Sequence, residues 1–138
     1  MDKLLVDTNV VLDLLMERKE FYQSASHLFT LADQKKVELG VSSLTFANAN
    51  YLLSRQYNAA KARELLRSFK VLVSILPMTE KVIELSLNSK FNDFEDAIQY
   101  YSALENNMGI IITRNLKDFK LAEIPVMGTG DYLGLQGI

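Results

Sequence analysis

The sequence predicts an α/β protein, a three-layer α/β/α sandwich with a parallel sheet between two layers of helices. Short apolar runs rich in β-branched residues alternate with longer segments in which apolar residues recur at helical spacing. Such alternation is typical of parallel sheets that are covered by helices on both faces. The chain has 138 residues, of which 49% are hydrophobic. We therefore expect a single domain over residues 1–138, with a core of its own.

Composition excludes several classes of protein. The chain has no cysteine, which excludes thiolate catalysis and cysteine zinc sites and is typical of a cytoplasmic protein. No stretch approaches the roughly 20 apolar residues of a membrane span, and Met1 leads almost directly into an apolar run, so we expect neither a membrane span nor a signal peptide. The net charge is −2, so any binding of nucleic acid must depend on local contacts. The single histidine, His27, lies opposite the apolar side of its predicted helix, at the surface.

The first half of the chain is expected to form strand, two helices, strand and two helices. Asn9 can cap the first helix, and Ser42 or Ser43 can open the third. The expected ranges are a strand at 4–6, helices at 9–15 and 21–35, a strand at 37–41, and helices at 43–55 and 58–69.

The third of these helices has two apolar sides. One side carries Leu44, Ala47 and Tyr51, and the other carries Phe46 and Leu53. A helix that is apolar on two sides is either buried or part of an interface, so we expect the chain to form a homodimer. Asn48 shares the side of Leu44, which we expect to face the sheet, and a buried amide there needs a hydrogen-bond partner.

The second half is expected to continue the alternation of strands and helices. Pro77 closes one strand, Thr79 caps the helix after it, and Gly109 ends the next helix. The expected ranges are a strand at 71–76, helices at 79–87 and 93–108, strands at 110–112 and 124–127, and a glycine-rich tail.

Two of the apolar runs are followed by acids. Asp7 comes directly after the first run, and Asp118 comes soon after the run at 110–112. Ligands bind beyond the carboxyl ends of the strands in open parallel sheets. We therefore expect these two strands to lie side by side at the centre of the sheet, with both acids at the same edge.

Further acids lie at the start of the helix that precedes the second of these runs. Asn92 or Asp93 can cap this helix, and Asp96 lies about 60° from Asp93 around the helix axis, on the flank of the apolar stripe. Glu95 is expected to point away. Asp96 is thus the helical acid best placed to face a site beside the sheet.

Several catalytic motifs are absent from the sequence, which leaves the carboxylates as the candidate catalytic groups. The sequence has no Walker-type loop, no G-x-G-x-x-G after a strand and no nucleophile elbow. Two carboxylates about 5 Å apart repel by roughly 3 kcal/mol at an effective dielectric of about 20, so they would share a proton or bind a cation. Oxygen ligands suit Mg²⁺ or Mn²⁺, which neutralise phosphate charge and activate water, so phosphodiester hydrolysis is the natural reaction class.

Four segments resemble, in order, the motif blocks of the PIN-domain family: VDTNVVLDLL, VSSLTFANANYLL, FEDAIQYYSAL and IITRNLKDF. That family has the α/β/α architecture expected above. Many members are Mg²⁺- or Mn²⁺-dependent ribonucleases, and the small ones resemble VapC-type toxins of toxin–antitoxin pairs. The resemblance implies an RNA substrate and an antitoxin partner. It also implies metal-site roles for Asp7, Asp96 and Asp118, a first loop shaped by Thr8 and Asn9, and a second loop lined by Thr113, Arg114 and Asn115.

One position departs from this pattern and leaves two alternatives open. Asn48 stands where most toxin-like members carry a glutamate, and Glu95 could replace that acid only if its helix starts irregularly. The expected function is a metal-dependent endoribonuclease that acts as a toxin. The main alternative is a PIN-fold protein that binds RNA or a partner without cutting. A phosphoacceptor domain shares the layers, but the sequence lacks a lysine at the end of a later strand.

Overall fold

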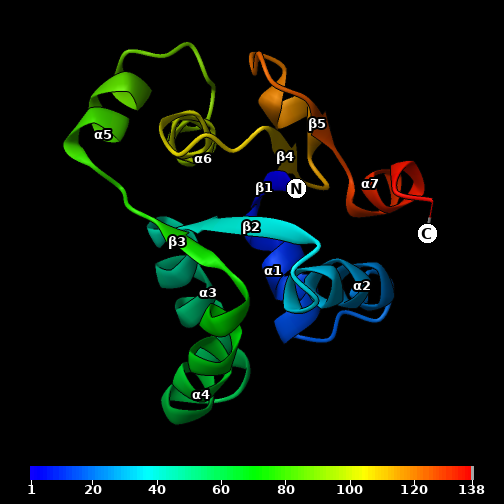
Figure 1. Cartoon of the computed structure of the whole chain (residues 1–138). Coiled ribbons are helices and arrows are strands. Elements are labelled where there is room, and N and C mark those ends of the chain that lie inside the picture. Colours follow the sequence, from blue (N-terminus) through cyan, green and yellow to red (C-terminus); the bar gives the residue numbers. More distant parts are fainter. Residues whose placement is uncertain (138) are drawn as a thin grey trace.

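The computed structural model describes residues 1–137 and contains a parallel sheet of five strands between two layers of helices (Figure 1). The order of the strands in the sheet is β3-β2-β1-β4-β5, so β1 is central and pairs with β4. This confirms the three-layer sandwich and the adjacency of the two strands that precede Asp7 and Asp118. The strands are β1 (Asp2–Val6), β2 (Val37–Ser42), β3 (Ser74–Leu76), β4 (Ile110–Ile112) and β5 (Val126–Met127).

The helices divide between the two faces of the sheet. Figure 1 shows α1 to α4 on one side and α5 and α6 on the other. The α-helices are α1 (Thr8–Leu15), α2 (Tyr22–Asp33), α3 (Ser43–Gln56), α4 (Ala59–Phe69), α5 (Glu80–Leu87), α6 (Phe94–Glu105) and α7 (Thr129–Leu135), and the 3₁₀ helices are η1 (Lys70–Leu72) and η2 (Leu116–Phe119).

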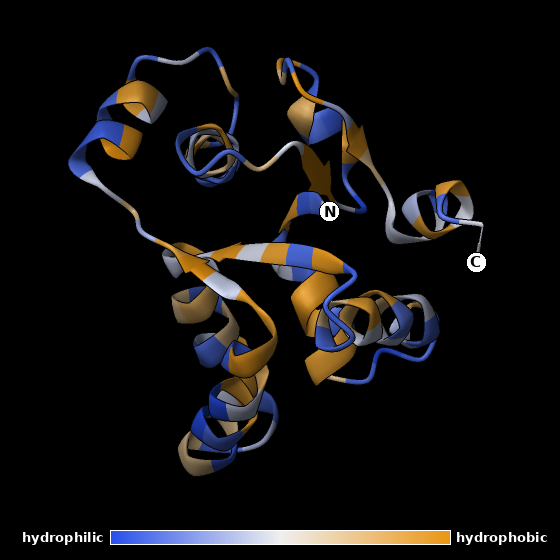
Figure 2. Ribbon diagram, viewed as in Figure 1, coloured by the Kyte–Doolittle hydropathy of each residue, from blue (hydrophilic) through white to orange (hydrophobic). Residues whose placement is uncertain are grey.

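The alternation of side chains along β1 supplies both halves of the core. Leu4 and Val6 pack into the cluster formed with α1 to α4 and α7, whereas Leu5 packs with Tyr100 and Ala103 of α6. All three β1 side chains are fully buried, and each such side chain stabilises the fold by about 1.5–3 kcal/mol. Figure 2 accordingly shows the strands largely in the hydrophobic colour, while the helices carry both colours.

The C-terminal segment differs from the sequence prediction, because the glycine-rich tail forms α7. Gly130 and Gly134 lower the helix propensity of this segment. Burial offsets that cost, since Tyr132 and Leu133 are 1% and 6% exposed. The hydroxyl of Tyr132 also donates to Asp2 Oδ2 over 2.7 Å.

The largest differences at the ends of elements concern α6 and β3. Helix α6 ends at Glu105 rather than at Gly109, because Asn107 takes a left-handed conformation with φ of 58°. Met108 then leaves the helix and packs against Gly40 of β2, where a Cβ atom would lie 2.9 Å from its sulfur. The third strand begins only at Ser74, because the preceding residues form η1.

The residues expected to form a homodimer interface are instead part of the core. Leu53 is fully buried, and Phe46 packs on Phe69 with ring centroids 5.9 Å apart. The homodimer therefore stays a prediction without support from these two residues. His27 is exposed, as predicted. Within residues 1–137, no helix has both the length and the hydropathy that crossing a membrane requires.

Candidate active site

Asp7 lies where β1 ends and α1 begins. Its backbone is extended, with φ of −71° and ψ of 156°, and its carboxylate Oδ1 accepts a 2.9 Å hydrogen bond from the Thr8 amide. Asp7 is thus the N-cap of α1, and the expectation that Asn9 takes this role is wrong, because the chain turns from strand to helix without a loop. The amide of Asp7 donates to the Ile112 carbonyl of β4 over 3.0 Å. Asp7 is therefore held at the carboxyl ends of both β1 and β4.

Two more neutral donors hold the Asp7 carboxylate. Gln99 Nε2 donates to Oδ1 over 3.1 Å, and Thr113 Oγ1 donates to Oδ2 over 2.8 Å. The same Gln99 amide donates to Thr45 Oγ1 over 2.9 Å, and Thr45 is 2.8 Å from the hydroxyl of Thr8. This network joins β1, α3, α6 and the end of β4 around a carboxylate that is only 7% exposed.

The Asp7 carboxylate is buried without a cationic partner among residues 1–137. Burial raises its pKa above the ordinary value, the hydrogen bonds from Thr113, Thr8 and Gln99 lower it, and the charge of Asp118 raises it again. Burial destabilises the ionised form of such an acid, and a nearby cation would stabilise that form by compensating its charge.

Two further acids come from the start of α6. Of the two predicted caps, Asp93 is the N-cap, and it accepts from the amides of Glu95 and Asp96 over 2.7 and 3.2 Å. Asp96 then faces the carboxyl end of the sheet, as expected. Burial, followed by the charges of Asp93, Asp7, Asp118 and Glu95, raises the pKa of Asp96 to about 7. The acids around Asp7 and Asp96 therefore act on one another electrostatically.

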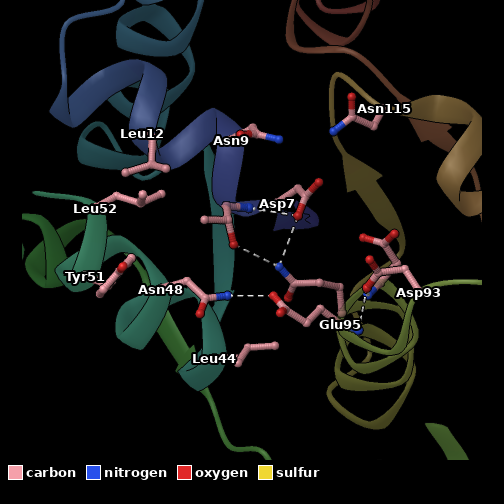
Figure 3. Close-up of a pocket in the computed structure, with 13 residues that line it drawn as sticks. Asp7, Asn9, Leu12, Leu44, Asn48, Tyr51, Leu52, Asp93, Glu95 and Asn115 are labelled. Atoms are coloured by element: carbon pink, nitrogen blue, oxygen red, sulfur yellow. Dashed lines mark hydrogen bonds between the residues drawn. The ribbon is translucent and has the colours of Figure 1, made fainter. Parts of the chain in front are cut away.

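A pocket of about 410 Å³ opens above Asp7 (Figure 3). Its two sides differ in chemistry. Figure 3 shows Asp93 and Glu95 of α6 on one side and the apolar Leu44, Tyr51 and Leu52 of α3 on the other, with Asp7 between them. No lysine or arginine lines it. The lining residues are Asp7, Thr8, Asn9, Leu12, Leu44, Asn48, Tyr51, Leu52, Asp93, Glu95, Asp96, Gln99 and Asn115.

Asp118 lies in η2 and lines an adjoining hollow of about 280 Å³. Asp93 and Asp96 line both spaces, so the predicted acids form one continuous cluster. This hollow also contains Lys90, Lys117 and Lys120. In residues 1–137, no three acidic or histidine side chains converge closely enough to coordinate a single ion as they stand.

Glu95 and Asn48 lie in the pocket, and two expectations about them are wrong. Glu95 does not point away: its Oε1 accepts a 2.8 Å hydrogen bond from Asn48 Nδ2. Asn48 does not face the sheet either, because the buried side of α3 carries Thr45, Ala49 and Leu53. Helical spacing gives the direction of Glu95 around the axis of α6 but not which element packs on that side. Here α3 lies on the side from which Glu95 projects.

Arg114 differs from its expected place in the loop that lines the site. Its guanidinium donates to Asp13 through Nε and Nη2 over 3.0 and 3.1 Å, and it lies 3.9 Å from the ring centroid of Phe21. Arg18 completes the contact at 3.4 Å from Asp13. Thr113 and Asn115 stay at the site, while Arg114 between them turns toward α1 and α2.

Sequence reasoning missed three polar side chains of this region. Gln99 lies one helical turn after Asp96, which was the available signal for it. Thr45 follows the N-cap Ser42 at the position where a cap bonds back to the backbone. Asp13 is 2% exposed in a helix whose neighbouring residues are apolar, and such an isolated acid indicates a buried partner.

The sequence is similar to those of known proteins over most of its length. Residues 3–117 match the family model described as PIN domain. Ribonuclease VapC1 of Aquifex aeolicus is 29% identical over 136 residues, which cover 95% of this chain and 93% of the relative.

Solved structures show the same fold. The DNA-bound VapBC of Salmonella typhimurium gives a TM-score of 0.71 at 15% identity, over 94% of this chain and 99% of that chain. A toxin–antitoxin complex from Klebsiella pneumoniae gives 0.65 at 23% identity, over 91% and 96%. The match to the family model, together with the fold and the acids at the carboxyl edge of the sheet, shows that this chain belongs to the PIN domain family.

Proposed function

We propose that this chain is a divalent-metal-dependent endoribonuclease and the toxin of a toxin–antitoxin pair. The observation that carries the proposal is the buried Asp7 carboxylate, which is held by neutral donors and faces other acids, with no compensating cation from the described residues 1–137. The relative named Ribonuclease VapC1 supports ribonuclease activity. The toxin–antitoxin complex among the similar structures supports the pairing with an antitoxin.

The side chains fit Mg²⁺ or Mn²⁺ by charge and by donor type. Asp7, Asp96 and Asp118 would hold the ion, since they offer oxygen ligands alone and their mutual repulsion favours a cation. Binding requires Asp96 and Asp118 to approach Asp7. When bound, the metal would neutralise phosphate charge and activate water for in-line displacement.

The other residues of the pocket orient the reactants. Gln99 and Thr113 fix both oxygens of Asp7, so this ligand needs little reorganisation when a cation arrives. Asn9 and Asn115 line the space around it as neutral amides, which donate to phosphate or ribose oxygens without adding negative charge.

The proposal is tested by unfolding and cleavage with Mn²⁺ and with EDTA. A metal at 100 times its dissociation constant stabilises a native state by about 2.7 kcal/mol, so the thermal midpoint should rise with Mn²⁺. Single-stranded RNA should be cut under the same conditions and not in EDTA. Equal midpoints at millimolar Mn²⁺, with no cleavage, would contradict the proposal.

A second candidate is a PIN-fold protein that binds RNA or a partner without cutting. Asn48 favours it, because this residue adds no charge to the pocket and engages Glu95 in a hydrogen bond. In that case RNA binding would persist in EDTA and no cleavage would follow Mn²⁺.

A further inference from the structure

We propose that the α3 side of the pocket is a nucleobase subsite, which holds one unstacked base of single-stranded RNA beside the phosphodiester at the acid cluster. This inference rests on the proposed function and adds to it the form of the substrate and the residues that bind it. The subsite consists of Leu44, Tyr51 and Leu52, with Arg55 next to the ring of Tyr51.

The subsite residues of α3 lie on a different side of the helix from the residues that it buries in the core. The side chains that α3 buries are Thr45, Ala49 and Leu53. Tyr51 is 59% exposed and Leu52 37%, although both line the pocket. An aromatic ring that is exposed at a pocket wall contributes little to folding and offers a flat apolar face to a ligand.

The arrangement of charge decides which part of RNA would lie on this surface. The acids of the pocket lie on the α6 side and at Asp7, whereas the three subsite side chains from α3 are uncharged (Figure 3). A phosphate next to Glu95 or Asp93 would be repelled unless a cation intervened. A base is neutral, so it can occupy the uncharged side while the phosphate lies toward the proposed metal ligands.

The pairing of Tyr51 with Arg55 fits single-stranded nucleic acid. Arg55 Nη1 donates to the Tyr51 hydroxyl over 3.1 Å, and its Cζ lies 5.6 Å from the ring centroid. The hydrogen bond holds Arg55 beside the ring of Tyr51, next to a pocket whose charged lining residues are all acidic. Proteins that bind single strands combine aromatic rings for stacking with cations for the backbone, and each stacked base contributes about 1–3 kcal/mol.

The test measures RNA binding by the full wild-type chain in Mn²⁺, with phosphorothioate linkages in the probe so that it resists hydrolysis if the chain is a nuclease. Fluorescein-labelled single strands of about ten nucleotides, one for each base, are titrated at low salt and followed by anisotropy. Relative to this parent chain, Tyr51→Ala should weaken binding of at least one probe about 5- to 150-fold. Tyr51→Phe should keep most of the affinity, and Tyr51→Leu should lose it.

The control variant is Tyr57→Ala, because Tyr57 follows the same helix, is 39% exposed and lies outside the pocket. A matched probe with abasic nucleotides should bind Tyr51→Ala and the parent chain equally well. Thermal midpoints of all variants show whether the fold is intact, and the Phe and Leu variants keep the test valid if Ala disturbs it.

Three results would overturn the subsite. Tyr51→Ala could match Tyr57→Ala, or it could weaken the abasic probe as much as the intact one. It could also change the mass seen by light scattering, which would assign the surface to contact between copies of the chain. None of these bears on metal-dependent cleavage by the wild-type chain, which the Mn²⁺ and EDTA experiment tests separately.

Discussion

Asp7 and Asp13 are two buried aspartates on one short helix, and their surroundings are opposite. Asp7 caps the start of α1, accepts hydrogen bonds from neutral groups and has no arginine or lysine partner among residues 1–137. Asp13 lies toward the other end of α1 and pairs with Arg114 and Arg18.

The helix dipole explains why the two acids need different partners. The N-terminus of a helix favours an anion, whereas the C-terminus disfavours it. Asp7 can therefore stay buried with neutral donors, while Asp13 requires cations. A buried acid that already has its counter-ion is part of the structure, and a buried acid without one retains an affinity for a cation that arrives from outside.

The largest effect is expected from Asp7→Asn. This change removes a proposed ligand charge and little volume, so cleavage should fall at least about 100-fold. The Thr113 hydroxyl can rotate to accept from the new amide, so stability in EDTA should stay within about 1 kcal/mol of wild type. RNA cleavage and thermal unfolding with Mn²⁺ check both points. A mutant still stabilised by Mn²⁺ as much as wild type would place the metal elsewhere.

Asp13→Asn applies the same chemical change to the other aspartate. It leaves Arg114 and Arg18 without their counter-ion, and breaking a buried ion pair costs about 3–5 kcal/mol. Because these arginines are 30% and 32% exposed, we expect a smaller loss of about 2–3 kcal/mol in urea unfolding. The stabilisation by Mn²⁺ should survive. If Asp13→Asn instead abolished the metal response and spared stability, the contrast between the two acids would be wrong.

Asp96→Asn should change how stability depends on pH. The pKa of Asp96 is raised from 3.8 to about 7 in the folded state, so its ionisation opposes folding. Its contribution is most favourable below pH 4 and is lost as pH rises toward 7. In EDTA at pH 8 the mutant should be more stable than wild type by about 1–2 kcal/mol, after allowance for solvent screening of a half-buried group. Urea unfolding from pH 4 to pH 8 measures this, and parallel profiles would contradict it.

The smallest effect is expected from Asn48→Glu. The new carboxylate would replace the amide that donates to Glu95, and two acids in contact should cost about 1 kcal/mol in EDTA. A cation in the pocket should reverse the sign, so Mn²⁺ should stabilise this mutant more than wild type. Asn48→Ala is the control, since it removes the same hydrogen bond without adding charge. Equal metal responses for Glu and Ala at this position would exclude Asn48 from the ion's surroundings.

Several parts of the site could be predicted because they depend on neighbours along the chain. The apolar run at 4–6 and the run at 110–112 each predict a buried strand, and the acids that follow them must then lie at the carboxyl edge. A cap at Asn92 or Asp93 and Asp96 as the inward acid follow from helical spacing, and the structure selects Asp93 as the cap.

Other parts could not be predicted, because they depend on which elements pack together. The apolar side of α3 with Leu44 and Tyr51 is indistinguishable by pattern from a core-facing side, and only the packing on the sheet selects Thr45, Ala49 and Leu53. The glycines of α7 indicate a loop until the burial of Tyr132 is known. In each case long-range packing overrides a local preference.

The alternation of strands and helices, the central pair of strands and the acids at their ends could all be predicted from the sequence, because they follow from periodicity and from the geometry of parallel sheets. The partners of the buried polar groups depend instead on how the elements pack in space. Arg114 sits between Thr113 and Asn115 in the chain, yet it binds Asp13 while they remain at the site. Burial and the choice of counter-ion depend on which elements pack together rather than on sequence order. They distinguish Asp7, which we propose as a cation ligand, from Asp13, which is paired within the fold.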